Sequence, residues 1–240
     1  MAGHNKWSKI KRQKGAADQK RGALFSKLSK AITIAAKNGV DPAMNFQLRI
    51  AVDKAKQANM PKENIDRAID KAKTGDALEE IMYEAYGPAG TAFLIEVATD
   101  NKNRAVTEIK TVLTRNGGKL ADSGSVAYLF KQVGQIVIDT ENYDEVELAA
   151  IDAGAEDTEH GDKHVYIYTD PKKLEEVRKE LEKAGYESND IGLEWHPNAS
   201  IEITDKEKAE KVINFSELLE DLDDVSRVSG NFIIDDKLID

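Results

Sequence analysis

The chain has 240 residues, of which 32% are charged and 40% hydrophobic, so several small cores fit its composition better than one large core. It contains no cysteine, which excludes disulfides and cysteine-based zinc sites, and its net charge is −10. No apolar run is long enough for a signal peptide or a membrane span, so we expect a cytoplasmic protein.

The net charge conceals a strong asymmetry along the chain. Residues 1–73 hold 17 Lys and Arg against 6 Asp and Glu, a net charge of +11, whereas the remainder holds 17 against 38, or −21. A split of this kind is typical of proteins that place one part on nucleic acid or on a membrane surface. Membrane binding needs an apolar face beside the positive charge, and the first 22 residues have none.

Residues 1–22 are basic and have no helical period, which indicates an arm. Three helical patterns with short connections follow and predict a small bundle. Asp41 is the expected cap of the second helix, with Pro42 in its first turn. The expected helices run from Ala23 to Asn38, from Asp41-Pro42 through Ala55, and from Met60-Pro61 to Gly75.

Beyond Gly75 the pattern changes to strands and helices. Residues 82–100 predict two strands joined by a turn at 87–90, followed by a helix over 101–116 and a short strand over 126–130. The order strand, helix, two strands, helix and strand within 134–198 is typical of a ferredoxin-like fold. A strand over 200–203, a helix over 205–222 and a strand over 225–228 would complete the sheet that begins at Met82.

We therefore expect an α+β protein in which an N-terminal three-helix domain is followed by two α+β domains, one inserted in the other. The predicted parts are a basic arm and helical bundle (1–76), a discontinuous α+β domain (77–133 plus 199–240) and an inserted ferredoxin-like domain (134–198).

The basic arm is the first candidate site. Residues 1–30 carry nine basic side chains and one acid, and lysine and arginine bind phosphates with release of counterions. Trp7 is placed to stack on an unpaired base. A solvated, disordered tail is the alternative, but the charge density and the scarcity of acids favour binding. The candidate nucleic-acid-binding residues are Lys6, Trp7, Lys9, Lys11, Arg12, Lys14, Lys20, Arg21, Lys27 and Lys30.

The turn at residues 87–90 is a second, possible functional loop. Two glycines and a proline fix its backbone, and the tyrosines that flank it are of a type that stacks on bases. A plain hairpin connection is the simpler interpretation, and no Gly-Lys-Ser/Thr follows to form a phosphate loop. The candidate residues are Tyr83, Tyr86, Gly87, Pro88 and Gly90.

Metal binding and catalysis have little support. His160 and His164, with Glu159 and Asp162, fall at a predicted hairpin tip that scatters their side chains, so we predict no metal site. No nucleophile motif is present, and we predict neither a cofactor nor an enzyme. The acidic residues near the C-terminus, from Glu217 to Asp224, are expected to form a solvated face. The alternative is that the acidic domains keep the protein off bulk nucleic acid, so that only the N-terminal bundle engages it.

The opening MAGHNKWSKIKRQKGAADQKRG, with LFSKLSKAI after it, resembles the YebC/PmpR family, and NMPKENIDRAI and YEAYGPAG extend the similarity through most of the chain. The resemblance implies a helical domain followed by two α+β domains. It also implies DNA-binding regulation of transcription, with a related mitochondrial translational activator and bacterial members linked to the ribosome. Asn5 stands where many members have serine, and the family offers no settled catalytic residues to transfer.

The favoured function is a nucleic-acid-binding regulator of gene expression, with no membrane partner and an open oligomeric state. No helix is recognisable as a major-groove reader, so the residues favour structured RNA or the ribosome, whereas the family label favours promoter DNA. A protein-interaction adaptor that uses the acidic α+β domains is the alternative, ahead of a nucleic-acid-processing enzyme.

Overall fold

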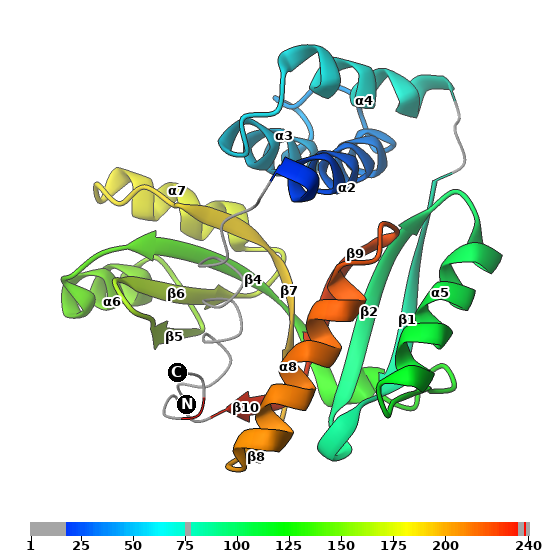
Figure 1. The fold of residues 1–240 in the computed structure, drawn as a ribbon. Coiled ribbons are helices and arrows are strands. Elements are labelled where there is room, and N and C mark those ends of the chain that lie inside the picture. Colours follow the sequence, from blue (N-terminus) through cyan, green and yellow to red (C-terminus); the bar gives the residue numbers. More distant parts are fainter. Residues whose placement is uncertain (1–17, 75–77, 235–237, 239–240) are drawn as a thin grey trace. The chain divides into compact units, whose positions relative to one another are not determined.

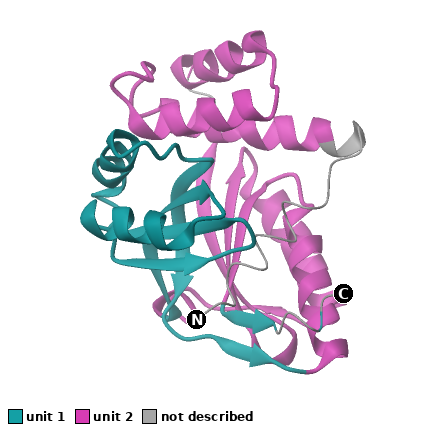
Figure 2. Ribbon diagram, turned by 90° about the vertical axis from the view of Figure 1, so that its left-hand side faces the viewer, with its two compact units in different colours: residues 1–14, 129–204, 231–240 teal, residues 15–128, 205–230 magenta. Residues whose placement is uncertain are grey.

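The computed structural model describes residues 18–74, 78–234 and 238, with side chains from residue 21 onward. These residues divide into two compact units (Figure 2): unit 1 includes residues 129–204 and the described residues after 230, and unit 2 includes the described residues up to 128 together with 205–230. Both units contain sheets with helices packed on them, which confirms the predicted α+β class. Within the described ranges, no helix is long and apolar enough to cross a membrane.

Unit 2 begins with the three predicted helices, α2 (Asp18–Ala36), α3 (Phe46–Gln57) and α4 (Lys62–Thr74) (Figure 1). Their apolar faces form one core in which Ile32, Leu48 and Ala55 are fully buried. Burial of this shared face stabilises helices that would be marginal alone. The helix α2 starts at Asp18, five residues before the predicted start.

The predicted cap of the second helix was wrong. Asn45 caps α3, because its side-chain oxygen accepts a hydrogen bond from the backbone N–H of Leu48 at 3.1 Å. Its amide group also donates to the carbonyl oxygens of Ala35 and Gly39, each at 2.7 Å. Asp41 instead accepts from the N–H of Ala43 in the preceding turn. Asn45 is the N-cap because its side chain joins the end of α2 to the start of α3.

The sheet of unit 2 has the strand order β3-β1-β2-β9. Its strands are β1 (Glu79–Tyr86), β2 (Ala92–Thr99), β3 (Lys119–Leu120) and β9 (Val225–Gly230), and its helices are α5 (Lys102–Arg115) and α8 (Lys206–Glu220). The predicted hairpin of β1 and β2 is confirmed, with the short 3-10 helix η1 (Pro88–Gly90) at its turn. Phe93 of β2 meets Phe215 of α8 with ring centroids 5.1 Å apart, in the core between helices and sheet.

The predicted strand over residues 126–130 was also wrong. Residues Ala127–Leu129 form a 3-10 helix, η2, and strand geometry begins only at Phe130. The backbone N–H groups of Val126 and Ala127 donate to the carboxylate of Glu84, so they are not available to a neighbouring strand.

Unit 1 contains a four-stranded sheet in the order β5-β6-β4-β7. All its neighbouring strands are antiparallel, and with the two helices this is the ferredoxin-like arrangement that the sequence predicted. The elements are β4 (Phe130–Asp139), α6 (Tyr143–Asp152), β5 (Asp157–His160), β6 (His164–Thr169), α7 (Leu174–Lys183) and β7 (Asp190–Pro197).

The strand predicted over residues 200–203 forms, but with a different partner. It is β8 (Ile201–Ile203), and it pairs in parallel with β10 (Phe232–Ile234) in a separate two-stranded sheet of unit 1. Of the three predicted elements, β9 joins the sheet that begins with β1, where it pairs with β2, and α8 packs on that sheet. The domain boundaries 1–76, 77–133 with 199–240, and 134–198 stay a proposal.

Gly118 lies where α8 approaches the strand β1. A Cβ atom at this position would stand 2.6 Å from Cε2 of Phe215 and 2.8 Å from the carbonyl oxygen of Tyr86, and neither the packed ring nor the backbone can move aside cheaply. We therefore expect Gly118→Ala to lower the free energy of unfolding by about 1–3 kcal/mol, measured by denaturant titration.

Gly22→Ala is the matched control, because Gly22 is exposed on α2 and a Cβ there would meet nothing within 4 Å. Alanine is the better helix former by about 1 kcal/mol, so this variant should be as stable as the parent or more stable. Equal stability of Gly118→Ala and the parent would show that the packing around Phe215 is loose.

Candidate nucleic-acid interface

The candidate residues of the basic arm fall mostly outside the described part of the chain. Lys6, Trp7, Lys9, Lys11, Arg12 and Lys14 lie outside it, and Lys20 lies within α2 at a position without a described side chain. Arg21, Lys27 and Lys30 are the members of the predicted set whose side chains are described, and all three lie on α2.

The bundle itself carries a surplus of positive charge. Residues 21–74 hold eleven Lys and Arg against five Asp and Glu. The cations with exposed positions are Arg21, Lys37, Lys56, Lys62, Arg67, Lys71 and Lys73. Lys56 pairs with Asp53 at 3.1 Å and Lys73 with Asp70 at 2.7 Å, but exposed pairs of this kind contribute little and leave the cations accessible to phosphate.

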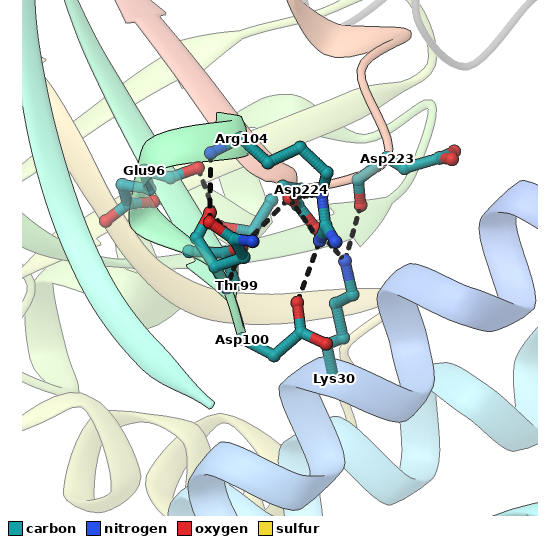
Figure 3. A network of polar contacts seen from close by, with 9 residues as sticks. Lys30, Glu96, Thr99, Asp100, Arg104, Asp223 and Asp224 are labelled. Atoms are coloured by element: carbon teal, nitrogen blue, oxygen red, sulfur yellow. Dashed lines mark hydrogen bonds and ion pairs between the residues drawn. The ribbon is translucent and has the colours of Figure 1, made fainter. Parts of the chain in front are cut away.

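Two of the predicted cations bind within unit 2. The ammonium of Lys27 donates to the carbonyl oxygen of Glu220 at the end of α8. Lys30 donates to the carbonyl oxygen of Asp223 at 2.9 Å and to the carboxylate of Asp224 at 2.5 Å (Figure 3). In the structure these two side chains therefore attach α2 to the connection between α8 and β9, and a role for them in nucleic-acid binding stays a prediction.

Asp224 is the centre of this attachment. The residue is 3% exposed, and its Oδ2 accepts hydrogen bonds from Thr99 at 2.9 Å and from Nη2 of Arg104 at 2.8 Å. Arg104 reaches Asp224 from α5 and also pairs with Asp100 at 2.8 Å. Together with Lys30 from α2, these contacts bring three segments to one carboxylate (Figure 3).

The electrostatics of Asp224 follow from these partners. Burial alone would raise the pKa of its carboxyl group, but the hydrogen bonds from Lys30, Arg104 and Thr99 favour the charged form, and the net pKa is lowered. The sequence predicted a solvated acidic face here, which is wrong for Asp224 because the residue is buried. The side chains that bind Asp224 lie more than 100 residues away in the chain, and no local pattern identifies such a contact.

The possible functional loop forms a tight, well-bonded turn. The N–H of Gly87 donates to the carbonyl oxygen of Thr91 at 2.8 Å, and the Thr91 hydroxyl donates to that of Pro88 at 2.7 Å. A Cβ on Gly87 would lie 2.4 Å from the ring of Phe93, and Gly90 has φ of +79°, so both positions favour glycine.

The two tyrosines of this candidate loop are not brought together. Tyr83 and Tyr86 are three residues apart on β1, so their side chains point to opposite faces of the sheet. Tyr83 is partly buried, and burial raises the pKa of its hydroxyl while Lys102 opposes the shift. The Tyr86 hydroxyl donates to the carbonyl oxygen of Ser125 at 3.3 Å, and the ammonium of Lys119 lies 5.4 Å from its ring centroid.

Glu84, between these tyrosines, is a functional candidate that the sequence did not reveal. It is 7% exposed, and its carboxylate accepts backbone hydrogen bonds from Gly124 at 2.6 Å, Val126 at 2.5 Å and Ala127 at 2.8 Å. Burial would raise its pKa, yet the three N–H groups outweigh burial and lower it. A lone glutamate in an alternating strand carries no signal for this arrangement.

The histidines near the β5–β6 hairpin have other partners. Nε2 of His160 lies 2.8 Å from Glu147, and its ring stacks on Tyr143. His164 is buried, with Nε2 2.8 Å from the hydroxyl of Tyr166. Among the residues that the structure describes, no three His, Asp or Glu side chains cluster in a way that could hold a metal ion.

Comparison with known proteins finds two family models along the chain. The model described as "TACO1/YebC protein N-terminal domain" matches residues 5–75, and that described as "TACO1/YebC second and third domain" matches residues 78–232. A relative from Halothermothrix orenii is 46% identical over 100% of this chain and 98% of its own length, and one from Aquifex aeolicus is 43% identical over 100% and 98%. Both bear the name "Probable transcriptional regulatory protein".

A solved structure agrees with these matches. The crystal structure of a conserved hypothetical protein from Aquifex aeolicus is 41% identical in sequence and superimposes with a TM-score of 0.87. The match covers 93% of this chain and 94% of that one.

The Asp224 contacts predict a pH-dependent loss of stability in Asp224→Asn. Asparagine retains the shape but not the charge, so we expect a loss of about 1.5–3 kcal/mol in the free energy of unfolding at pH 7. Because folding lowers the pKa of Asp224, its contribution is fully present above the ordinary carboxyl pKa of about 3.9 and is lost as the pH falls through the lower folded value. Denaturant titrations from pH 7 to pH 3 should show the difference between variant and parent shrinking.

Asp223→Asn provides the control, since Asp223 is exposed and contacts Lys30 through its backbone carbonyl, which the substitution keeps. A difference between Asp224→Asn and the parent that stayed constant down to pH 3 would contradict a charged Asp224.

Proposed function

The chain belongs to the TACO1/YebC family, and on that basis we propose that it is a nucleic-acid-binding regulator of gene expression in the cytoplasm. The basic arm and the helical bundle make the contact in this proposal. The names of the relatives in Halothermothrix orenii and Aquifex aeolicus support the regulatory part of it.

The observation that carries the nucleic-acid part is the charge split. Residues 1–73 have a net charge of +11 and the rest of the chain −21, and a surplus of lysine and arginine binds a phosphate backbone with release of its counterions. The exposed cations on α3 and α4, such as Lys56 and Arg67, extend this surface beyond the arm. The acidic remainder repels the same ligand, so the charge split orients the contact toward the N-terminal third.

Phosphate contacts give affinity and position, and they do not by themselves read a sequence. Structured RNA fits this chemistry, whereas the family names favour a target in transcription. We propose the shared chemistry, a phosphate backbone, and leave the choice between RNA and DNA to experiment. No catalytic step is part of the proposal.

A protein-interaction role has one specific observation in its favour. On α6, Leu148 is 62% exposed and Ile151 is 63% exposed, beside acidic residues of the same helix such as Asp144 and Asp152. Exposed apolar side chains are common singly, and this pair is small compared with a typical stable interface. Nucleic-acid binding therefore remains the main proposal.

The charge of the arm predicts a steep salt dependence. Replacing Lys6, Lys9, Lys11, Arg12 and Lys14 by glutamine removes five positive charges from residues outside the described range. We expect the slope of log affinity against log salt to flatten by about 0.7–0.9 for each phosphate that the variant no longer neutralises. Binding to a fluorescent RNA or DNA probe should weaken at least about tenfold at physiological salt.

The matched control replaces by glutamine five exposed lysines from the acidic part of the chain, Lys172, Lys173, Lys179, Lys183 and Lys206. It changes the net charge equally, so it separates a local contact from a general charge effect. Equal affinity of the arm variant and the parent would rule out the arm as the contact.

Cross-linking in cells with sequencing of the recovered nucleic acid distinguishes the targets. We expect recovery of bound nucleic acid that depends on the five arm cations. Predominantly RNA would assign a role after transcription, and discrete DNA fragments would assign a role at promoters. If the parent protein recovered no more nucleic acid than the arm variant, the proposal as a whole would be contradicted.

A further inference from the structure

The helix α6 of unit 1 presents two large apolar side chains to solvent. It packs on the four-stranded sheet through Val146 and Ala150, which are fully buried (Figure 1). Leu148 and Ile151 lie three residues apart on the opposite side of the helix, where they are 62% and 63% exposed. Single exposed apolar residues are common, whereas two on one helix face form a small apolar surface.

Acidic residues lie on both sides of this apolar pair along the helix. Asp144 and Glu145 precede Leu148 by four and three residues, and Asp152 follows it by four, so all three acids share its helix face. All three are exposed. These five residues form one surface, apolar in the middle and acidic at both ends, which we call the α6 surface.

The segment around α6 contains no positive charge to neutralise these acids. Residues 132–162 hold ten Asp and Glu and no Lys or Arg. The last turn of α6 has no basic residue, although the C-terminal end of a helix carries a partial negative charge that favours a cation. Asp152 adds a full negative charge at that end. A cation from a ligand is therefore attracted to the α6 surface.

The cations of the next helix are paired within that helix. On α7, Arg178 and Lys179 pair with Glu175, and Lys183 pairs with Glu180 at 2.7 Å. Arg178 also pairs with Glu182. These contacts direct the positive charge of α7 toward its own glutamates and leave the acidic character of the α6 surface intact.

The side of α6 that faces the sheet is held firmly. The carboxylate of Glu147 accepts a hydrogen bond from the hydroxyl of Thr158 at 2.8 Å and lies 2.8 Å from Nε2 of His160. The hydroxyl of Tyr143 accepts from the backbone N–H of Lys163 at 3.0 Å. A helix fixed in this way presents its exposed residues in advance, which reduces the ordering cost of binding.

We propose that the α6 surface binds a basic amphipathic helix of a partner protein. Apolar side chains three or four positions apart on such a helix pack on Leu148 and Ile151, and its lysines and arginines pair with the acids at both ends. The inference does not depend on nucleic-acid binding, because the α6 surface attracts cations whereas the basic N-terminal third attracts phosphate.

Charge decides between this ligand and the others that an apolar surface could bind. Nucleic acid and anionic membranes are repelled by the acids of the α6 surface. A second copy in a two-fold contact would place the same acids against each other, so like charges would oppose it. Two apolar side chains make a small contact, which fits a short helix bound weakly and reversibly better than a large domain.

The apolar part of the proposal is tested by fluorescence anisotropy with the full chain and two labelled peptides. One is a lysine–leucine helix of about 18 residues with its leucines on one face, and the other has the same composition with the leucines on all faces. The parent should bind the first peptide more tightly. For Leu148→Ala with Ile151→Ala we expect affinity for it to fall about 5- to 50-fold. Met44→Ala with Val40→Ala removes two exposed apolar side chains elsewhere, and should change the affinity less than about twofold.

The charged part is tested with Asp144→Asn, Glu145→Gln and Asp152→Asn together. We expect affinity for the amphipathic peptide to fall about 3- to 30-fold at physiological salt. The matched control neutralises three exposed acids on or just before α8, Glu202→Gln, Glu207→Gln and Glu210→Gln, and should bind as the parent does. Thermal denaturation of each variant should match the parent, since every altered residue is exposed.

Several outcomes would overturn the inference. Equal affinity of the parent for both peptides, or no binding of either, would show that no apolar docking surface exists. Equal losses in the α6 and control variants would indicate general charge attraction. If the arm variant bound the peptide at least about tenfold more tightly than the parent, residues of the chain's own arm would be the occupant. A dimer that Leu148→Ala with Ile151→Ala dissociates, seen by sedimentation, would assign the surface to a second copy. Failure of the nucleic-acid tests would leave this inference standing.

Discussion

The carboxylate of Asp224 is the contact on which the arrangement of unit 2 depends. A buried acid needs charged or polar partners, and here they come from α2, from the end of β2 and from α5. Each of those segments must therefore reach the same point next to the start of β9. The bundle is attached to one end of the sheet as a result. Lys27 and Lys30 bind the end of α8 and the connection from α8 to β9, whereas cations such as Lys56 and Lys62 remain exposed.

The elements that follow from local patterns could be predicted, because periodicity and turn residues act within a few positions. The three bundle helices, the β1–β2 hairpin and the ferredoxin-like order of unit 1 are of this kind. The errors arose where a distant group competed with a local one. Asn45, and not the predicted Asp41, caps α3 because its side chain also bonds the end of α2. Residues 127–129 form a 3-10 helix in place of the predicted strand because the carboxylate of Glu84 accepts hydrogen bonds from the N–H groups of Val126 and Ala127.

The candidate site was predictable in charge and much less so in contacts. Counting lysines and arginines located the basic third of the chain, but it could not show that Lys30 binds an acid 194 residues further along. The strand β8 shows the same limit, since the alternating pattern of its three residues predicts a strand but does not indicate which strand it pairs with. Long-range pairing of this kind depends on the whole fold, and a single sequence contains no record of it.

The length of β1 fixes the distance between two groups of contacts in unit 2. The Asp224 contacts lie beside Thr99, opposite the first residue of β1, and the loop at residues 121–128, which Glu84 and Tyr86 bind, lies at its other end. Eight residues at the usual strand rise separate the two ends by about 25 Å. The attachment of the helical bundle and the attachment of that loop therefore act at opposite ends of one strand, at an interval that the backbone alone sets.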